Sequence, residues 1–119
     1  MPNLTDTLNK LLEPDGAMCA ALVDSGSGML LAKVGSGLDL DLAAAGNTEV
    51  MRAKMKTMKS LGLNDSIEDI LITLGKQYHI IRPVANKEGL FLYLVLDRAR
   101  SNLALARRAA QDVEKGIQL

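Results

Sequence analysis

The stretch Asp39–Gly62, DLDLAAAGNTEVMRAKMKTMKSLG, has the apolar periodicity of one long helix, and the rest of the chain is organised around it. Projected at roughly 100° per residue, its apolar side chains cover more of the circumference than one packing surface needs. One flank comprises Leu42, Ala43, Gly46, Val50, Ala53 and Leu61. The next flank comprises Ala44, Met51, Met55 and Met58. We expect the first flank to pack on a sheet.

The second flank is predicted to be an interface between subunits. Met51, Met55 and Met58 have the alternating spacing of a helix-to-helix seam, and methionine suits adaptable contact surfaces because it is unbranched and polarisable. The alternative is that both flanks are buried inside one domain. The remaining arc holds Glu49 and a basic stripe, which either faces a partner or is only a solvated face. The stripe comprises Arg52, Lys56 and Lys59.

Composition predicts one domain over residues 1–119, long enough to bury a core without disulfides. The chain has 14 basic and 14 acidic residues, so no net field attracts nucleic acid or a membrane surface. It has one Phe, two Tyr and no Trp, which leaves few platforms on which bases could stack. We therefore expect no nucleic-acid partner.

Cysteine usage and the start of the chain predict a cytoplasmic protein. The single Cys19 cannot form an internal disulfide, and Met1-Pro2-Asn3 begins no basic-then-apolar export signal. The longest apolar run, Leu90–Leu96, is far shorter than the ~20 residues that span a bilayer. We expect no membrane insertion.

The segments before the long helix predict a short helix and a hairpin. Leucines recur at helical spacing from Leu4 to Leu12, and Pro14-Asp15-Gly16 ends that pattern. Two apolar runs, 17–23 and 29–34, flank a turn rich in Gly and Ser. Strands joined by so tight a connection must be antiparallel.

The segments after the long helix predict a meander and a final helix. Hairpin-sized connections separate three strands, Ile67–Leu74, Gln77–Val84 and Leu90–Leu96. The last strand has no polar alternation except one Tyr hydroxyl, so we expect it to be central and covered on both faces. Ser101 is predicted to cap a helix whose apolar positions run from Leu103 to Ile117.

Several of these features together resemble the Roadblock family, named for the dynein light chain, which includes bacterial and archaeal regulators of small Ras-like GTPases. The resemblance covers essentially the whole chain through the order and spacing of short patterns. These are Pro14-Asp15-Gly16-Ala17, Leu22-Val23-Asp24 with Gly28, the helix from Asp39, Tyr78-His79-Ile80-Ile81-Arg82-Pro83-Val84, Gly89-Leu90-Phe91-Leu92, and Asn102-Leu103-Ala104-Leu105-Ala106-Arg107.

The resemblance implies an α+β (α/β) fold of Roadblock/profilin-like type. In such a fold a five-stranded antiparallel sheet has the long helix on one face and the two terminal helices on the other. It also implies homodimers or heterodimers that pair the long helices and join sheet edges, and a role as a scaffold or regulator of a small GTPase. The family has no catalytic residues to transfer.

No pattern in the sequence predicts an enzyme, a cofactor or a metal. The glycine-rich turns at 26–28 and 35–37 lack the lysine and the spacing of a phosphate-binding loop. Cys19 and His79 are the only thiol and imidazole, and Cys19 lies in an apolar strand. Glu68 and Asp69 are adjacent, so on a strand they would point to opposite faces and could not act as a pair.

Two functional hypotheses remain from the sequence. The first is a dimeric interaction module that binds a small GTPase or a larger complex. The second is a small-molecule sensor with a pocket between sheet and helices. The first is favoured because no cluster of polar residues suggests a ligand cavity.

Overall fold

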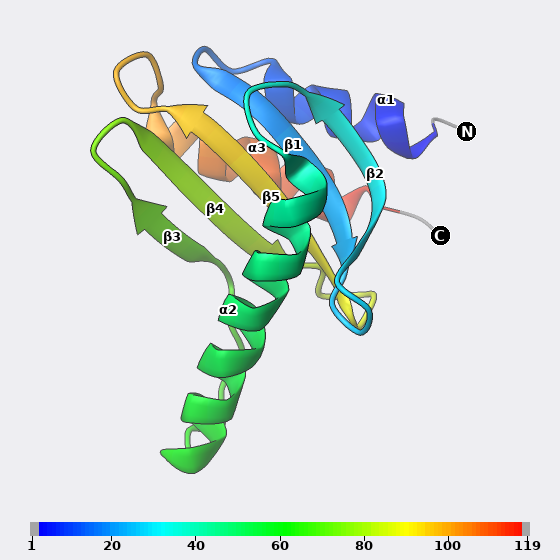
Figure 1. Cartoon of the computed structure of the whole chain (residues 1–119), viewed down its shortest axis with the longest axis vertical. Coiled ribbons are helices and arrows are strands. Elements are labelled where there is room, and N and C mark those ends of the chain that lie inside the picture. Colours follow the sequence, from blue (N-terminus) through cyan, green and yellow to red (C-terminus); the bar gives the residue numbers. More distant parts are fainter. Residues whose placement is uncertain (1–2, 118–119) are drawn as a thin grey trace.

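The computed structural model describes residues 3–117, so Met1 and Pro2, where the sequence shows no export signal, lie outside the described residues. Figure 1 shows a sheet with α2 on one face and α1 and α3 on the other. The elements are α1 (Leu4–Asn9), η1 (Lys10–Leu12), β1 (Ala17–Asp24), β2 (Met29–Gly35), α2 (Leu40–Ser60), β3 (Ile70–Thr73), β4 (Gln77–Pro83), β5 (Leu90–Asp97) and α3 (Leu103–Lys115). The predicted fold class and element order are confirmed.

The sheet runs in the order β2-β1-β5-β4-β3, and every neighbouring pair is antiparallel. β5 is in the middle, where Tyr93 pairs with Ala21 of β1 and Ile81 of β4. Every residue from 91 to 96 is buried. The predicted central position of this unbroken apolar strand is therefore confirmed, because only a strand covered on both faces buries successive side chains.

Alternating side chains of the strands form two cores, one on each face of the sheet. The core under α1, η1 and α3 includes Leu8, Leu11, Leu22, Leu94, Ala110 and Val113. The core under α2 includes Ala21, Leu40, Ala44, Met51, Phe91 and Tyr93. The single long helix and the pair of terminal helices thus cover opposite faces, as the resemblance implied.

Side-chain caps fix the starts of the helices. Asp39 Oδ1 accepts a hydrogen bond from the Leu42 N–H at 3.1 Å, which caps α2 at the first residue of the predicted helical stretch. The predicted Ser101 cap of α3 is wrong. Asn102 Oδ1 accepts from the Leu105 N–H at 3.1 Å, whereas the Ser101 hydroxyl donates to a backbone carbonyl of the preceding turn at 2.6 Å.

Two glycines occupy backbone conformations that other residues rarely adopt. Gly62 has φ +70° and follows the end of α2, a position at which helices commonly end on a left-handed residue. Gly35 has φ +79° at the end of β2, and a Cβ there would collide with the Met18 carbonyl oxygen and the Cys19 Cα. The close approach of β2 to β1 therefore depends on glycine at this position.

β3 is shorter than predicted, because ladder pairing begins only at Ile70 instead of Ile67. Residues just before it are held by side chains. Both oxygens of Asp69 accept hydrogen bonds from Arg107 of α3, at 2.9 and 2.8 Å. This contact ties the approach to β3 to the far helix layer, and the four residues that follow pair with β4.

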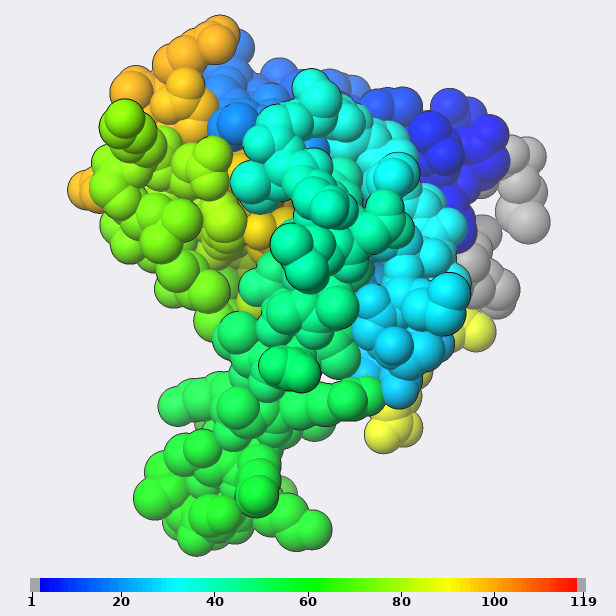
Figure 2. All heavy atoms as spheres, in the orientation of Figure 1, coloured from blue at the N-terminus to red at the C-terminus, as the bar shows by residue number. Residues whose placement is uncertain are grey.

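The first half of α2 lies over β1 and β2, and its second half projects past the end of the sheet (Figures 1 and 2). Its buried residues are Leu40, Ala44, Thr48 and Met51. From residue 52 to residue 60 every side chain is exposed except that of Met58, which is half-buried. The helix is therefore longer than the sheet that supports it.

The sequence-based assignment of the two flanks of α2 is wrong for the part of the helix that covers the sheet. Leu42 and Val50, expected on the sheet, are 71% and 38% exposed. Ala44 and Met51, expected at a subunit interface, are 1% and 4% exposed and pack under the helix. The buried stripe includes Thr48, whose hydroxyl donates to a carbonyl of its own helix at 2.7 Å. Because that internal bond lets a threonine face a core, the apolar pattern alone indicated the wrong arc.

Candidate interaction surface

The side of α2 that faces away from the sheet is apolar and exposed. Its members, which we call the outer flank, are Leu42, Gly46, Val50, Ala53 and Leu61. Their spacing places them on one side of the helix. A helix face with this composition, left in solvent, is typical of a surface that packs against another protein chain.

Contacts within the chain do not explain why Gly46 of the outer flank is a glycine. A Cβ added at this position would meet nothing within 4 Å, so packing inside the chain does not require glycine. Glycine in a helix interior nevertheless costs about 1 kcal/mol relative to alanine. Gly46 and Ala53 project little from the helix surface, so a second helix could approach this flank closely. This glycine is the sequence signal by which the outer flank could have been identified.

The sheet also has an open side next to α2. In the described part of the chain, the face over β3 and β4 beside the helix is left uncovered (Figure 1). Ile70, Ile72 and His79 occupy this face and are half-buried. β3 pairs only with β4, and its sequence ILIT has none of the charges or prolines that protect free edges. We call β3 and this face the open edge.

His79 belongs to a polar chain within the open edge. Its ring nitrogens lie 2.8 Å from Gln77 Oε1 and 2.8 Å from the Tyr93 hydroxyl. Because an amide oxygen only accepts, Nε2 has the proton and Nδ1 accepts from Tyr93. Burial lowers the pKa of His79 and raises the pKa of Tyr93. Both groups are therefore neutral at pH 7 and suited to an interface with little water.

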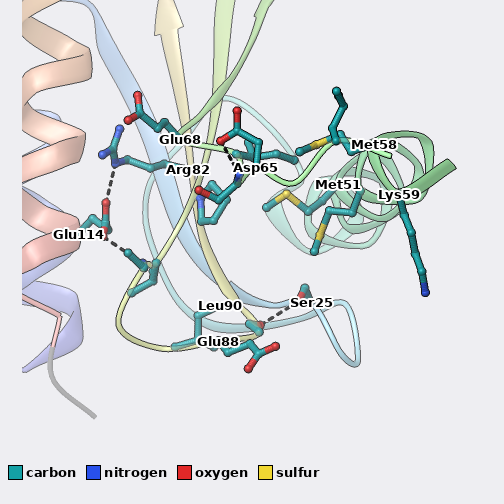
Figure 3. A pocket seen from close by; sticks show the side chains of 18 of the residues that line it. Ser25, Met51, Met58, Lys59, Asp65, Glu68, Arg82, Glu88, Leu90 and Glu114 are labelled. Atoms are coloured by element: carbon teal, nitrogen blue, oxygen red, sulfur yellow. Dashed lines mark hydrogen bonds and ion pairs between the residues drawn. The ribbon is translucent and has the colours of Figure 1, made fainter. Parts of the chain in front are cut away.

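The three methionines of the predicted interface do not lie on the outer flank. Met51 is buried, Met58 is half-buried and Met55 is 57% exposed. All three line a cleft of about 860 Å³ between the projecting half of α2 and the end of the sheet (Figure 3). We call this space the methionine cleft.

A charged cluster stands at the far side of the methionine cleft. Arg82 Nε of β4 donates to Glu114 Oε1 of α3 at 2.7 Å, and Glu114 Oε2 accepts from the Ala85 N–H at 3.1 Å (Figure 3). Asp69 lies 3.9 Å from Arg82 and also binds Arg107. The Arg82 and Glu114 side chains are only 14% and 8% exposed, so the cluster fixes α3 to the sheet.

The predicted basic stripe is split in the structure. Arg52 donates to the carbonyl oxygens of Ser25 and Gly26 at 2.6 and 2.8 Å, which anchors the β1–β2 hairpin to α2. Lys56 and Lys59 are exposed, and no ion pair within residues 3–117 involves them. Of the predicted stripe, these two lysines remain available to face a partner.

Within residues 3–117, the side chains considered as catalytic or metal-binding candidates do not come together in a reactive arrangement. Cys19 is fully buried, and burial raises the pKa of its thiol, which keeps it protonated. Between residues 3 and 117 no three His, Cys, Asp or Glu side chains are grouped closely enough to hold a metal ion. Over the same residues, no helix is long and apolar enough to cross a bilayer.

Comparison with known proteins identifies the fold. No protein-family model and no curated protein sequence matches the chain. A Roadblock/LC7 domain from Streptomyces avermitilis superposes with a TM-score of 0.84 at 14% identity, covering 97% of this chain and 94% of that one. The chain has a Roadblock-type fold. MglB of Myxococcus xanthus superposes with a TM-score of 0.79 at 18% identity, covering 96% of this chain and 93% of that one.

Other solved structures with the Roadblock-type arrangement include an MglB described as having a tetrameric arrangement. It superposes with a TM-score of 0.81 at 20% identity and covers 92% of this chain and 81% of that one. At identities this low the agreement concerns the path of the backbone. The side chains that recognise partners have to be inferred from this chain alone.

Proposed function

We propose that residues 1–119 form one dimeric, non-enzymatic Roadblock-like domain in the cytoplasm. It acts as a scaffold or regulator that binds a small Ras-like GTPase or a larger complex. The observation that supports this best is the outer flank, an apolar helix surface for which the chain has no internal partner among its described residues. The open edge beside it supplies a strand with free backbone groups.

We place the dimer interface on the outer flank and the open edge, because Ala44 and Met51 of the predicted set Ala44, Met51, Met55 and Met58 are already buried within one chain. In a two-fold dimer the same patch is used by both copies, so the two α2 helices would run antiparallel with Gly46 near their closest approach. The two β3 strands would pair through their free edges. The resemblance to Roadblock proteins implies the same two modes of contact.

The charges along α2 favour the antiparallel arrangement. The first half of the helix is acidic and the second half is basic, so two antiparallel helices would place opposite charges side by side. The acidic residues are Asp39, Asp41 and Glu49, and the basic residues are Arg52, Lys54, Lys56 and Lys59. We therefore expect the dimer to weaken as salt rises, since these exposed charges are screened.

Light scattering at low micromolar concentration tests the dimer. We expect twice the 12.8 kDa mass of one chain. Repeating the measurement at 50 mM and 500 mM salt should show a larger monomer fraction at high salt. A monomer under both conditions would refute the proposed assembly.

The proposed role toward a GTPase rests on the Roadblock resemblance and is tested separately. The purified protein alone should not hydrolyse GTP. Added to a Ras-like GTPase from the same organism, it should bind and change the rate of hydrolysis. Lys56→Glu combined with Lys59→Glu should weaken that complex, because both lysines are exposed and take part in no ion pair within residues 3–117. If the protein binds no such GTPase, the proposed role toward a GTPase is wrong and only the scaffold role remains.

A further inference from the structure

The methionine cleft is a second apolar surface on the opposite side of α2 from the outer flank. At 100° per residue, Met51, Met55 and Met58 lie roughly 120° or more around the helix from Gly46 and Ala53. The outer flank therefore contributes no side chain to this cleft. Its occupant is a separate question from dimerisation.

The two long walls of the methionine cleft are built from different elements. Pro83, Val84 and Leu90 form the wall at the end of the sheet, where the Val84 N–H donates to the Leu90 carbonyl at 2.9 Å. Met55 and Met58 lie opposite, on the part of α2 that has no sheet beneath it. Flexible, polarisable side chains facing a fixed apolar wall suit a partner whose shape can vary, such as an amphipathic helix.

Carboxylates border the methionine cleft on both long sides. Asp65 and Glu68 lie at one rim and Glu88 lies at the other (Figure 3). Within residues 3–117 none of the three takes part in an ion pair. Lys59 points away from the cleft in Figure 3, and Lys115 lies at the α3 end. The two rims therefore present negative charge to anything that lies between them.

We infer that the methionine cleft binds an amphipathic helix of a partner protein, with an apolar stripe flanked on both sides by lysine or arginine. The stripe would lie on the methionines and the wall of Pro83, Val84 and Leu90. The basic flanks would meet Glu68 on one rim and Glu88 on the other. This inference goes beyond the proposed function and does not depend on the dimer.

A small metabolite fits the methionine cleft less well. Ligand sites usually enclose the ligand and point a few unpaired polar groups at it. Here the cleft is open to solvent, and its buried polar groups, Arg82 and Glu114, already bind each other. In the described part of the chain, every buried side-chain nitrogen and oxygen has a hydrogen-bond partner.

The test uses a set of synthetic helical peptides that share one apolar stripe and differ only in their flanks, which are lysine, glutamine or glutamate. Binding is followed by the methyl resonances of the methionines. We expect affinity to fall in that order, with lysine at least about tenfold tighter than glutamate, because several exposed charge pairs change sign. Resonances of Met55 and Met58 should shift, while Met18, which lies away from the cleft, should not.

Charge reversal at the rims provides the matched control. Glu68→Lys with Glu88→Lys should reverse the order of affinities, whereas Glu13→Lys with Asp15→Lys, at exposed positions outside the cleft, should leave it unchanged. Val50→Glu, placed on the outer flank, should bind the peptides as the unmodified protein does, which separates this result from the fate of the dimer.

Three outcomes would overturn the inference. The first is that no peptide in the set binds. The second is that binding is insensitive to the flanks or shifts methionines other than those of the cleft. The third is that native mass spectrometry finds a co-purified small molecule which the lysine-flanked peptide displaces, because the cleft would then be a ligand site.

Discussion

The substitution Gly46→Ala should have opposite effects on the folding stability of the single chain and on the affinity of the dimer. In the single chain the new methyl group meets no atom within 4 Å, so only helix propensity changes. That change favours the folded chain by about 1 kcal/mol. For a chain of this size, each kcal/mol added to the free energy of unfolding raises the unfolding temperature by about 3–6 °C.

In the dimer the same methyl group should act in the opposite direction. If Gly46 lies where the two helices approach most closely, each copy inserts one methyl group into a packed contact. Overpacking of this kind costs about 1–3 kcal/mol, and two-fold symmetry applies it twice. We therefore expect the dissociation constant to rise by at least about tenfold.

The assay combines thermal unfolding with analytical ultracentrifugation. Because dimerisation itself raises the apparent stability, unfolding is measured in the Val50→Glu background, where the dimer is expected to be absent. Gly62→Ala is the comparison at a glycine outside the helix, since its φ of +70° strains any other residue. A Gly46→Ala protein with an unchanged or tighter dimer would refute the placement of Gly46 at the closest approach.

Two further predictions concern the charged cluster and the histidine. Glu114→Ala leaves Arg82 nearly buried without its 2.7 Å partner and should lower the free energy of unfolding by about 1.5–3 kcal/mol in urea titrations, whereas Glu88→Ala on the exposed rim should change it little. Because burial holds the pKa of His79 below its ordinary value of 6.5, the unfolded chain binds the proton more tightly, so stability should fall as pH drops through 6.5. His79→Gln should reduce that slope between pH 7.5 and 5.5, and an unchanged slope would show that other groups cause it.

Periodicity and turn chemistry were sufficient to predict the architecture. The unbroken apolar run ending at Leu96 could only be a central strand, and the tight connections could only join antiparallel strands. The predicted helical stretch Asp39–Gly62 matches α2 closely, since Asp39 caps the helix and Gly62 follows its end, positions with strong residue preferences. These features are local, so one sequence contains enough information to fix them.

The sequence did not show in the same way which face of α2 packs on the sheet and which is exposed. Its apolar arc is wider than one contact, and hydrophobicity does not say which part meets the sheet. Thr48 is the reason the choice failed, because a hydroxyl bonded within the helix behaves as a core group although it counts as polar. The methionine cleft was also unpredictable, since it depends on how far α2 projects beyond the sheet and on which loops border it.

The central claim is that the outer flank, and not the methionine side of α2, holds two copies together. Light scattering and circular dichroism of Val50→Glu and Met55→Glu test this most directly, because both residues are exposed and both changes introduce the same charge. We predict that Val50→Glu gives a folded monomer, because the charge would be buried in the seam, and that Met55→Glu leaves the dimer intact. A dimer that survives Val50→Glu and is lost with Met55→Glu would contradict the account.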